Sequence, residues 1–214
     1  LRDARPSRLE DLIALNALYR PGPMDLIPTF VARKHGREEV VYPHPLVESV
    51  LSETYGIMVY QEQVMQTAQI LGGYSLGGAD LLRRAMGKKK PEEMAQHREI
   101  FRDGAAKNGI GQDKADEIFD LMERFAGYGF NKSHAAAYSL LAYQTAWLKV
   151  HYTAEFFCSN LTIELDNTDK IKVLLEDARK MGLQIEPPDI NRGHHVFEPV
   201  SDQIIRYGLG AIKG

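Results

Sequence analysis

The chain has 214 residues, of which 44% are hydrophobic and 26% are charged, and its formal net charge is −3. This composition is typical of a globular protein with enough apolar residues to bury a core. The length suits one large domain or two small ones. The slight negative charge excludes a protein that binds polyanions over its whole surface. The single cysteine, Cys158, lies in an apolar run, which excludes a disulfide framework and favours a reducing compartment.

No segment has the properties of a membrane span or of a secretory signal. The longest apolar stretch, residues 135–150, is interrupted by polar residues such as Gln144 and Lys149, and it is too short and too polar to cross a bilayer. The chain starts with polar residues and without a methionine, and it stops just after a short apparent strand. We therefore expect no signal peptide, and we expect the chain to be a piece of a larger protein.

Most of the chain is predicted to be helical. A short amphipathic helix is expected over residues 9–18, and the prolines and glycines of residues 20–45 then predict an irregular, loop-rich segment. Apolar residues at helical spacing predict further helices, each bounded by a glycine, a proline or a cap. These helices are expected over residues 61–71, 79–86, 91–107, 113–126, 134–151 and 168–181.

Two of these helices have contrasting faces. The helix over 113–126 has the clearest core face, because its apolar residues from Ala115 to Phe125 recur at helical spacing. Ser133 is the expected N-cap of the helix over 134–151. That helix has so few polar residues that we expect it to be buried on most sides.

The last part of the chain has a different pattern. Short β-like runs at 183–185, 196–197 and 204–207 are separated by prolines and glycines, and they predict a small mixed tail. No repeat and no flexible linker divides the chain. The predicted fold class is therefore mainly α, with a helical body and a small mixed α/β C-terminal portion.

A cluster of positive charge lies at the end of the helix predicted over 79–86. Its five cationic side chains fall within eight residues, at Arg83, Arg84, Lys88, Lys89 and Lys90. The cluster predicts a partner that carries phosphate groups, since arginine binds phosphate oxygens through a planar fork and lysine binds them as a point charge. The alternative is a solvated helix end, where cations favour the helix dipole. A P-loop is excluded, because Leu82 and Lys89 stand at positions where its glycine and its serine or threonine are required.

A second group of polar and aromatic residues precedes the apolar helix over 134–151. Its members are Tyr128, Phe130, Asn131, Lys132, Ser133 and His134. The unpaired N–H groups and the dipole of a helix N-terminus favour an anion, so the polar members together form a candidate anion site. The two aromatic members offer faces on which bases stack. The alternative is a capped helix whose aromatic side chains pack into the core.

Two more segments contain candidate contacts. Arg20 stands in the rigid loop Arg20-Pro-Gly-Pro-Met24, where proline and glycine restrict the backbone. In the segment Tyr55–Gln63, the amides Gln61 and Gln63 stand at a predicted helix start, where they act as caps or contact a ligand. The cap is the favoured interpretation, because side-chain amides at this position commonly bind the backbone.

Complete catalytic motifs are absent from the sequence. There is no cluster of His, Cys, Asp or Glu at the spacing of metal ligands, and no Asp-x-Asp pair of the kind that holds Mg²⁺ ions. There is also no nucleophile elbow. The residues by themselves therefore predict a helical module that contacts phosphate but does not carry a complete catalytic site.

Six motifs together resemble the DNA polymerase III alpha subunit, the C family of bacterial replicative DNA polymerases, and they stand in that family's order. They are Leu18-Tyr-Arg-Pro-Gly-Pro-Met24, Tyr55-Gly-Ile-Met-Val-Tyr-Gln-Glu-Gln63, Ala79-Asp-Leu-Leu-Arg-Arg-Ala-Met-Gly-Lys-Lys89, Gly129-Phe-Asn-Lys-Ser-His-Ala-Ala-Ala-Tyr-Ser139, Pro187-Pro-Asp-Ile-Asn191 and Tyr207-Gly-Leu-Gly-Ala-Ile-Lys-Gly214. Several long motifs in register are more specific than any one of them. The resemblance covers nearly the whole chain.

The resemblance implies that this chain is the fingers region of such a polymerase. Residues 1–165 would be the helical fingers body that carries the nucleotide- and DNA-contacting motifs, and residues 166–214 a smaller helix-plus-short-strands portion. The family adds a deoxynucleotide to a primer 3′ end on a template. Its catalytic aspartates and two Mg²⁺ ions lie in the palm, outside this chain. The implied partners are primer–template DNA, deoxynucleoside triphosphates and other replicase subunits, the implied compartment is the cytoplasm, and the chain alone is expected to be inactive.

The same resemblance suggests roles for the candidate residues. The residues expected to bind the nucleotide or its phosphates are Arg83, Arg84, Lys88, Arg20, Asn131, Lys132 and His134. Lys89 and Lys90 are expected to contact DNA. Two alternatives remain open: a nucleic-acid-binding module without nucleotide specificity, and a protein-interaction module in which the charge serves solubility.

Overall fold

The computed structural model describes residues 1–88 and 91–212. This described part is mainly α-helical with one small three-stranded sheet, which confirms the fold class predicted from the sequence. The chain divides into two compact units, Leu1–Leu140 and Leu141–Gly214, and the boundary falls within helix α8 (Lys132–His151). The sequence predicts a different division, between residues 165 and 166, which separates the part with the nucleotide- and DNA-contacting motifs from the rest. That division stays a prediction.

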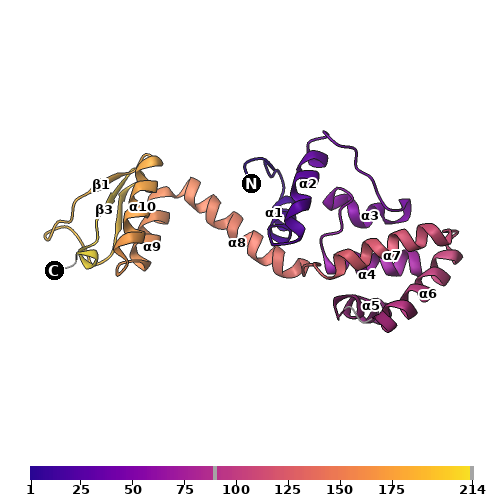
Figure 1. Ribbon diagram of the computed structural model, residues 1–214. Coiled ribbons are helices and arrows are strands. Elements are labelled where there is room, and N and C mark those ends of the chain that lie inside the picture. The colour runs from indigo at the N-terminus through magenta and orange to yellow at the C-terminus, as the bar shows by residue number, and fades with distance from the viewer. Residues whose placement is uncertain (89–90, 213–214) are drawn as a thin grey trace. The chain divides into compact units, whose positions relative to one another are not determined.

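The first unit is built from short helices around two apolar cores (Figure 1). Its elements before α8 are α1 (Leu9–Leu18), η1 (Pro23–Leu26), α2 (Ile27–Lys34), η2 (Pro45–Val47), α3 (Glu48–Leu51), η3 (Ser52–Thr54), α4 (Gln61–Gly72), α5 (Leu76–Lys88), α6 (Pro91–Lys107) and α7 (Gln112–Ala126). One core gathers Leu18 of α1, Phe30 of α2 and Tyr60. The other lies among α4, α5, α6 and α7 and includes Phe101 and Phe119.

Local signals explain where several of these helices begin and end. Pro91 occupies the first turn of α6, where the N–H that proline lacks would have no helical partner. Gly73 follows α4 and Gly109 follows α6 with φ values of +67° and +74°, a conformation that glycine adopts without strain. The stripe predicted for α7 is buried at Ile118 and Phe119, which confirms that face.

Helices α4 and α6 approach each other through two glycines. A Cβ atom on Gly104 would lie 1.8 Å from the carbonyl oxygen of Gly72, and a Cβ atom on Gly72 would lie 2.6 Å from Cδ2 of Phe101. Neither glycine has a positive φ, so the contact requires the lack of a side chain rather than conformational freedom. Asn108 adds a polar link across the same contact, since its Nδ2 donates to the carbonyl of Leu71 at 2.9 Å.

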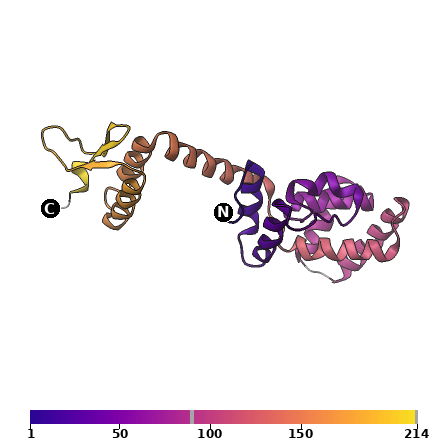
Figure 2. The ribbon, with the colours of Figure 1, turned by 90° about the horizontal axis from the view of Figure 1, so that it is seen from above.

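The second unit packs two helices against the small sheet (Figure 1, Figure 2). Its elements after α8 are α9 (Thr153–Ile163), α10 (Thr168–Lys180), β1 (Gln184–Glu186), β2 (Glu198–Ser201), β3 (Ile204–Arg206) and η4 (Leu209–Ala211). The strand order is β1-β3-β2, with β3 parallel to β1 and antiparallel to β2. Phe157, Leu161 and Ile205 are fully buried between helices and sheet.

Three boundaries differ from their predictions. The loop-rich segment 20–45 contains helix α2, because Pro28 falls in its first turn and the apolar Phe30 gains a buried place. Helix α5 continues through Gly87 instead of ending there, since a glycine in a helix weakens it without breaking it. Strand β2 starts at Glu198, after the run predicted at 196–197.

Helix α8 differs from its prediction at its start and in its surroundings. It begins at Lys132, and Asn131 rather than Ser133 caps it, because Oδ1 of Asn131 accepts a backbone N–H three residues later at 2.9 Å. Within the part of the chain that the structure describes, its buried residues are Ala135 and Ser139, so the expectation of a helix buried on most sides is wrong. An apolar composition favours packing of the helix against another segment, but it does not specify which segment that is.

The contact between α4 and α6 leads to a prediction. The substitution Gly104→Ala is expected to lower the free energy of unfolding by about 1–3 kcal/mol, because the added methyl group overlaps the backbone of Gly72. Urea unfolding followed by circular dichroism measures the change. Gly87→Ala is the matched control, since no atom lies within 4 Å of its Cβ position, and it should not destabilise the chain. Equal midpoints for the two variants would contradict the prediction.

Candidate phosphate-binding site

The candidate site is built where the start of α4 meets the loop that precedes α8. The backbone N–H of Gln61 donates to the carbonyl of Phe130 at 3.0 Å, and the N–H of Phe130 donates to the carbonyl of Val59 at 3.2 Å. These bonds pair Tyr60 with Phe130 as an isolated parallel bridge. The side chain of Gln61 extends the pairing, because its Nε2 donates to the carbonyl of Gly129 at 3.0 Å. The two segments are therefore held together by backbone groups.

The loop that carries Arg20 joins the same place. The Nε of Arg20 donates to the carbonyl of Ala17 at 2.9 Å, and its Nη2 donates to the carbonyl of Tyr128 at 2.5 Å. The guanidinium lies over the ring of Phe130, 4.5 Å from its centre. Burial lowers the pKa of Arg20, yet a guanidinium stays charged in proteins. Gly22 has a φ of +102°, and a Cβ there would lie 2.7 Å from the ring of Tyr128.

Arg83 and Arg84 share one carboxylate. Oδ1 of Asp80 accepts from Nε and Nη2 of Arg83 at 3.1 and 2.7 Å, while its Oδ2 lies 2.8 Å from Nη2 of Arg84. The hydrogen bond from Arg83 lowers the pKa of Asp80. The exposed fraction of the side chain is 24% for Arg83 and 62% for Arg84. Nη1 of Arg83 also reaches Oε1 of Gln61 at 3.4 Å, so Arg83 is the member of the pair that contacts α4.

Lys132 lies beside a polar hollow of about 530 Å³ in the first unit. Its Nζ pairs with Oε2 of Glu53 at 2.7 Å, and its backbone N–H donates to both carboxylate oxygens of Glu62 at 3.1 Å. The Nζ also lies 5.4 Å from the ring centre of Tyr60. The positive charge of Lys132 is therefore already balanced by a carboxylate of the same unit.

The remaining predicted residues have different surroundings. Asn131 uses its side-chain oxygen to cap α8, as the alternative interpretation of that segment proposed. The ring of His134 lies 5.5 Å from that of Phe130 and 4.7 Å from that of Tyr138. Lys88 is exposed near the end of α5, and Lys89 and Lys90 lie outside the described residues.

The structure thus brings together some of the predicted residues. Arg20 and His134 both contact Phe130, and Arg83 reaches the same loop through Gln61. Among the residues that the structure describes, neither Arg84 nor Lys88 contacts that loop, and both side chains are exposed. The cationic cluster forms one feature in the sequence, but in the structure its described members lie in two different environments.

Sequence reasoning did not single out Asp80 or Glu53, and it favoured a cap for Gln61. The spacing of Asp80 from Arg83 and Arg84, at i+3 and i+4, is a signal that could have found the first of these contacts. The pairing of Glu53 with Lys132 joins residues 79 positions apart, so no local pattern indicates it. Of the two amides, Gln63 is the structural one, since its Oε1 accepts the N–H groups of Val59 and Tyr60.

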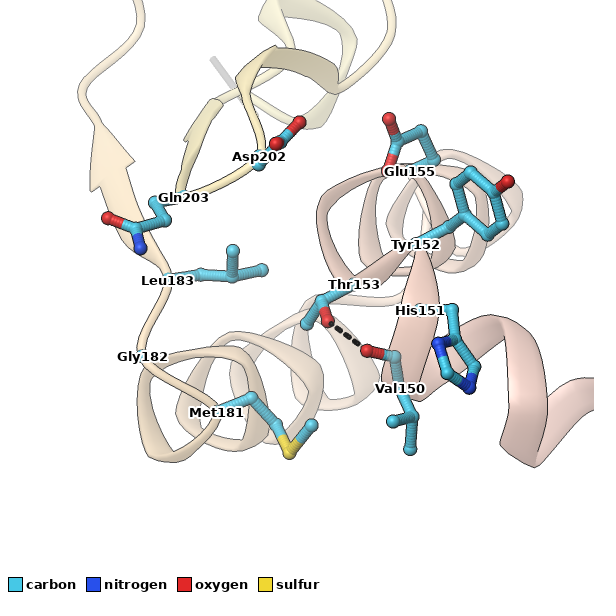
Figure 3. A pocket seen from close by; sticks show the side chains of 10 residues that line it. All are labelled: Val150, His151, Tyr152, Thr153, Glu155, Met181, Gly182, Leu183, Asp202 and Gln203. Carbon is cyan, nitrogen blue, oxygen red and sulfur yellow. Dashed lines mark hydrogen bonds between the residues drawn. The ribbon is translucent and has the colours of Figure 1, made fainter.

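A second hollow, of about 480 Å³, lies in the second unit (Figure 3). It is lined by Val150, His151, Tyr152, Thr153, Glu155, Met181, Gly182, Leu183, Asp202 and Gln203. Figure 3 shows Asp202 and Gln203 approaching from the sheet side, His151 at the end of α8 and Tyr152 just before α9. None of the site residues predicted from the sequence lines it.

Neither a metal centre nor a membrane span is found in what the structure describes. No three His, Cys, Asp or Glu side chains among residues 1–88 and 91–212 are grouped so that they could hold a metal ion. These residues therefore do not form a site for the Mg²⁺ ions that the resemblance implies, and the resemblance places those ions in the palm, outside this chain. No described helix is long and apolar enough to cross a membrane.

The fold and the site define a helical module in which Arg20 contacts the loop before α8 and Arg83 is linked to that loop through Gln61. Residues 1–109 match the family model described as the bacterial DNA polymerase III alpha subunit finger domain. The chain belongs to this family. The loop that precedes α8 and the second unit lie beyond the matched residues.

Curated relatives extend the similarity to the full chain. This chain is 67% identical to DNA polymerase III subunit alpha of Xylella fastidiosa (strain Temecula1). The match spans 214 residues, which cover 100% of this chain and 18% of that relative. The identity is 65% over 214 residues with the protein of the same name from Neisseria meningitidis (strain Z2491), and 57% over 221 residues with that from Escherichia coli (strain K12). In both cases the match covers 100% of this chain and 19% of the relative. The chain thus spans about a fifth of the length of these relatives.

The contacts of Arg20 lead to a prediction about the site's own stability. Arg20→Lys is expected to lower the free energy of unfolding by about 1–2 kcal/mol, because an ammonium cannot bind two carbonyls and cover the Phe130 ring at once. Urea unfolding of the chain measures this change. Arg37→Lys is the control, since the side chain of Arg37 is exposed and has no hydrogen bond or ion pair to the described residues. A loss of stability in the control as large as in Arg20→Lys would refute the assignment.

Proposed function

We propose that this chain is the fingers part of a replicative DNA-directed DNA polymerase, and that it positions the incoming deoxynucleoside triphosphate and the template. The reaction is the template-directed extension of a primer 3′ end with release of pyrophosphate. The observation that carries the proposal is the placement of Arg83. It is partly exposed, and it is linked through Gln61 to the loop that also holds Arg20 and His134.

The physical demands of phosphoryl transfer support this assignment. Such reactions depend mostly on positioning and on neutralising charge around the phosphates. Arginine meets both demands, because its planar guanidinium binds two phosphate oxygens in a defined geometry. Family membership adds support, since the family model is named for the finger domain of a polymerase subunit.

Other parts of the reaction are assigned to residues outside this chain. Catalytic aspartates and Mg²⁺ ions would belong to the rest of the longer polypeptide, of which this chain is about a fifth if it resembles the relatives in length. We therefore expect no polymerisation by the chain alone. Other replicase subunits are proposed as further partners. A cytoplasmic location is proposed as well, in agreement with a buried free thiol at Cys158.

A second candidate function is binding of nucleic acid without nucleotide specificity. The exposed side chains of Arg84 and Lys88 on α5 favour it, because exposed cations bind phosphate backbones regardless of sequence. The two functions are compatible if different cations serve them. A third possibility, a protein-interaction module, requires that none of these cations binds either ligand.

The nucleotide role is tested in the full-length polypeptide that contains this chain. Arg83→Ala is expected to reduce kcat/KM for the deoxynucleotide about ten-fold or more, because a fixed phosphate contact is lost. Steady-state primer extension measures it at saturating primer–template. Arg37→Ala is the control, because it removes an exposed positive charge that is not among the candidate site residues. Wild-type kinetics in a correctly folded Arg83→Ala protein would reject the nucleotide role.

The DNA role is tested by binding to a fluorescent primer–template in a salt series. The variant Arg84→Ala/Lys88→Ala is expected to bind more weakly and to lower the slope of log K against log salt by about one to two units, since each backbone contact releases about one counterion. The deoxynucleotide KM should change less in this variant than in Arg83→Ala. An unchanged salt slope and affinity would show that these cations do not bind the DNA backbone.

A further inference from the structure

We propose that Asp80 and Gln61 are positioning residues that hold the guanidinium of Arg83 in the orientation in which it binds a phosphate group. This inference rests on the proposed nucleotide role of Arg83 and adds the two residues on which that role depends. Both contact Arg83 directly in the structure, and they approach it from different helices.

Asp80 and Gln61 use only some of the hydrogen-bond donors of Arg83. A guanidinium has five N–H groups. Asp80 accepts one from Nε and one from Nη2, and Gln61 accepts one from Nη1. This leaves two N–H groups, one on each terminal nitrogen, on a side chain that is 24% exposed. A phosphate can therefore accept two hydrogen bonds from Arg83 without displacing either neighbour.

Gln61 is itself held in one orientation. Its Nε2 donates to the carbonyl of Gly129 and its backbone N–H donates to the carbonyl of Phe130, both at 3.0 Å. Turning the amide over would bring its oxygen against the Gly129 carbonyl and its NH₂ group against Arg83. The carbonyl of Gly129 therefore directs Oε1 of Gln61 towards Arg83, and it ties the arginine to the loop before α8.

Asp80 acts from within α5. It lies three residues before Arg83 and four before Arg84, so one helical turn brings all three side chains together. Its two oxygens serve different arginines, Oδ1 for Arg83 and Oδ2 for Arg84. The hydrogen bond from Arg83 lowers the pKa of Asp80, so the carboxylate stays ionised at neutral pH and keeps accepting from both.

The carboxylate could instead act only against the ligand, because a negative charge next to two arginines repels a triphosphate. The two possibilities predict opposite signs. If Asp80 positions Arg83, its loss weakens nucleotide binding. If it only competes with phosphate for the arginines, its loss strengthens nucleotide binding.

The experiment is a double-mutant cycle in the full-length polypeptide, with steady-state primer extension on a primed template as the readout. Asp80→Asn keeps the shape of the side chain and removes its charge. It is expected to raise the deoxynucleotide KM about five-fold or more in the wild-type background and less than about two-fold in the Arg83→Ala background, because residues that act through one another are not additive. Gln61→Met keeps the length of the side chain and should follow the same pattern. Asp80→Glu keeps the charge, so it should raise the deoxynucleotide KM less than Asp80→Asn does.

A control variant and a folding test separate the positioning role of Asp80 from a purely structural role. Asp103→Asn, which removes an exposed charge from α6, is the control and should leave KM and kcat unchanged. Circular dichroism and thermal unfolding confirm that each variant is folded. If one of the two variants Asp80→Asn and Gln61→Met does not fold, the other carries the cycle alone.

Three results would overturn the inference. An equal rise in KM in both backgrounds would mean that Asp80 acts independently of Arg83, and a fall in KM would mean that it only competes with the ligand. In these two cases the proposed function still stands if Arg83→Ala alone raises KM. If Arg83→Ala leaves KM and kcat unchanged, the nucleotide role of Arg83 fails, and the positioning role fails with it.

Discussion

The pairing of the first turn of α4 with the loop before α8 is the contact on which the candidate site depends. Tyr60 and Phe130 form a single bridge, yet the bonds around it fix the backbone of both segments. Phe130 then receives Arg20 on its face, and Gly129 directs the amide of Gln61 towards Arg83. Residues that are more than 100 positions apart, such as Arg20 and Tyr128, become neighbours through this contact. Without the bridge, Arg20 and Arg83 would not be linked to the same loop.

Each carboxylate near these cations limits their freedom. Asp80 contacts both arginines of α5, and Glu53 contacts Lys132. An exposed ion pair adds little to stability, commonly less than about 1 kcal/mol, so stability alone does not explain these pairings. Their larger effect is on order. A long side chain that is already held in one rotamer loses less conformational freedom when a ligand binds, which favours binding. In the function proposed here, the carboxylates would therefore hold the cations in place for a phosphate group while reducing the net positive charge of the surface.

The sequence predicts the helices better than their surroundings. The stripe of α7 and the glycine that follows α4 depend on local spacing, and both are confirmed. The predicted cap of α8, Ser133, is wrong, because asparagine and serine both cap helices and only the backbone geometry selects Asn131. The predicted burial of α8 is wrong as well, because the apolar composition of a helix does not identify the segment that packs against it. In the site, local spacing indicates Asp80, whereas the bond from Gln61 to Gly129 spans 68 positions and has no local signal.

The two adjacent arginines illustrate what sequence alone leaves open. Neighbouring residues on a helix point about 100° apart, so Arg83 and Arg84 leave α5 in different directions although both reach Asp80. Arg83 turns towards Gln61 and is 24% exposed, while Arg84 is 62% exposed. A nucleotide held near the loop before α8 would meet the first, and a strand lying along the outer face of α5 would meet the second. Because Asp80 contacts both, a change at either arginine alters the charge that its neighbour experiences, and the two functions proposed for α5 are coupled through one carboxylate.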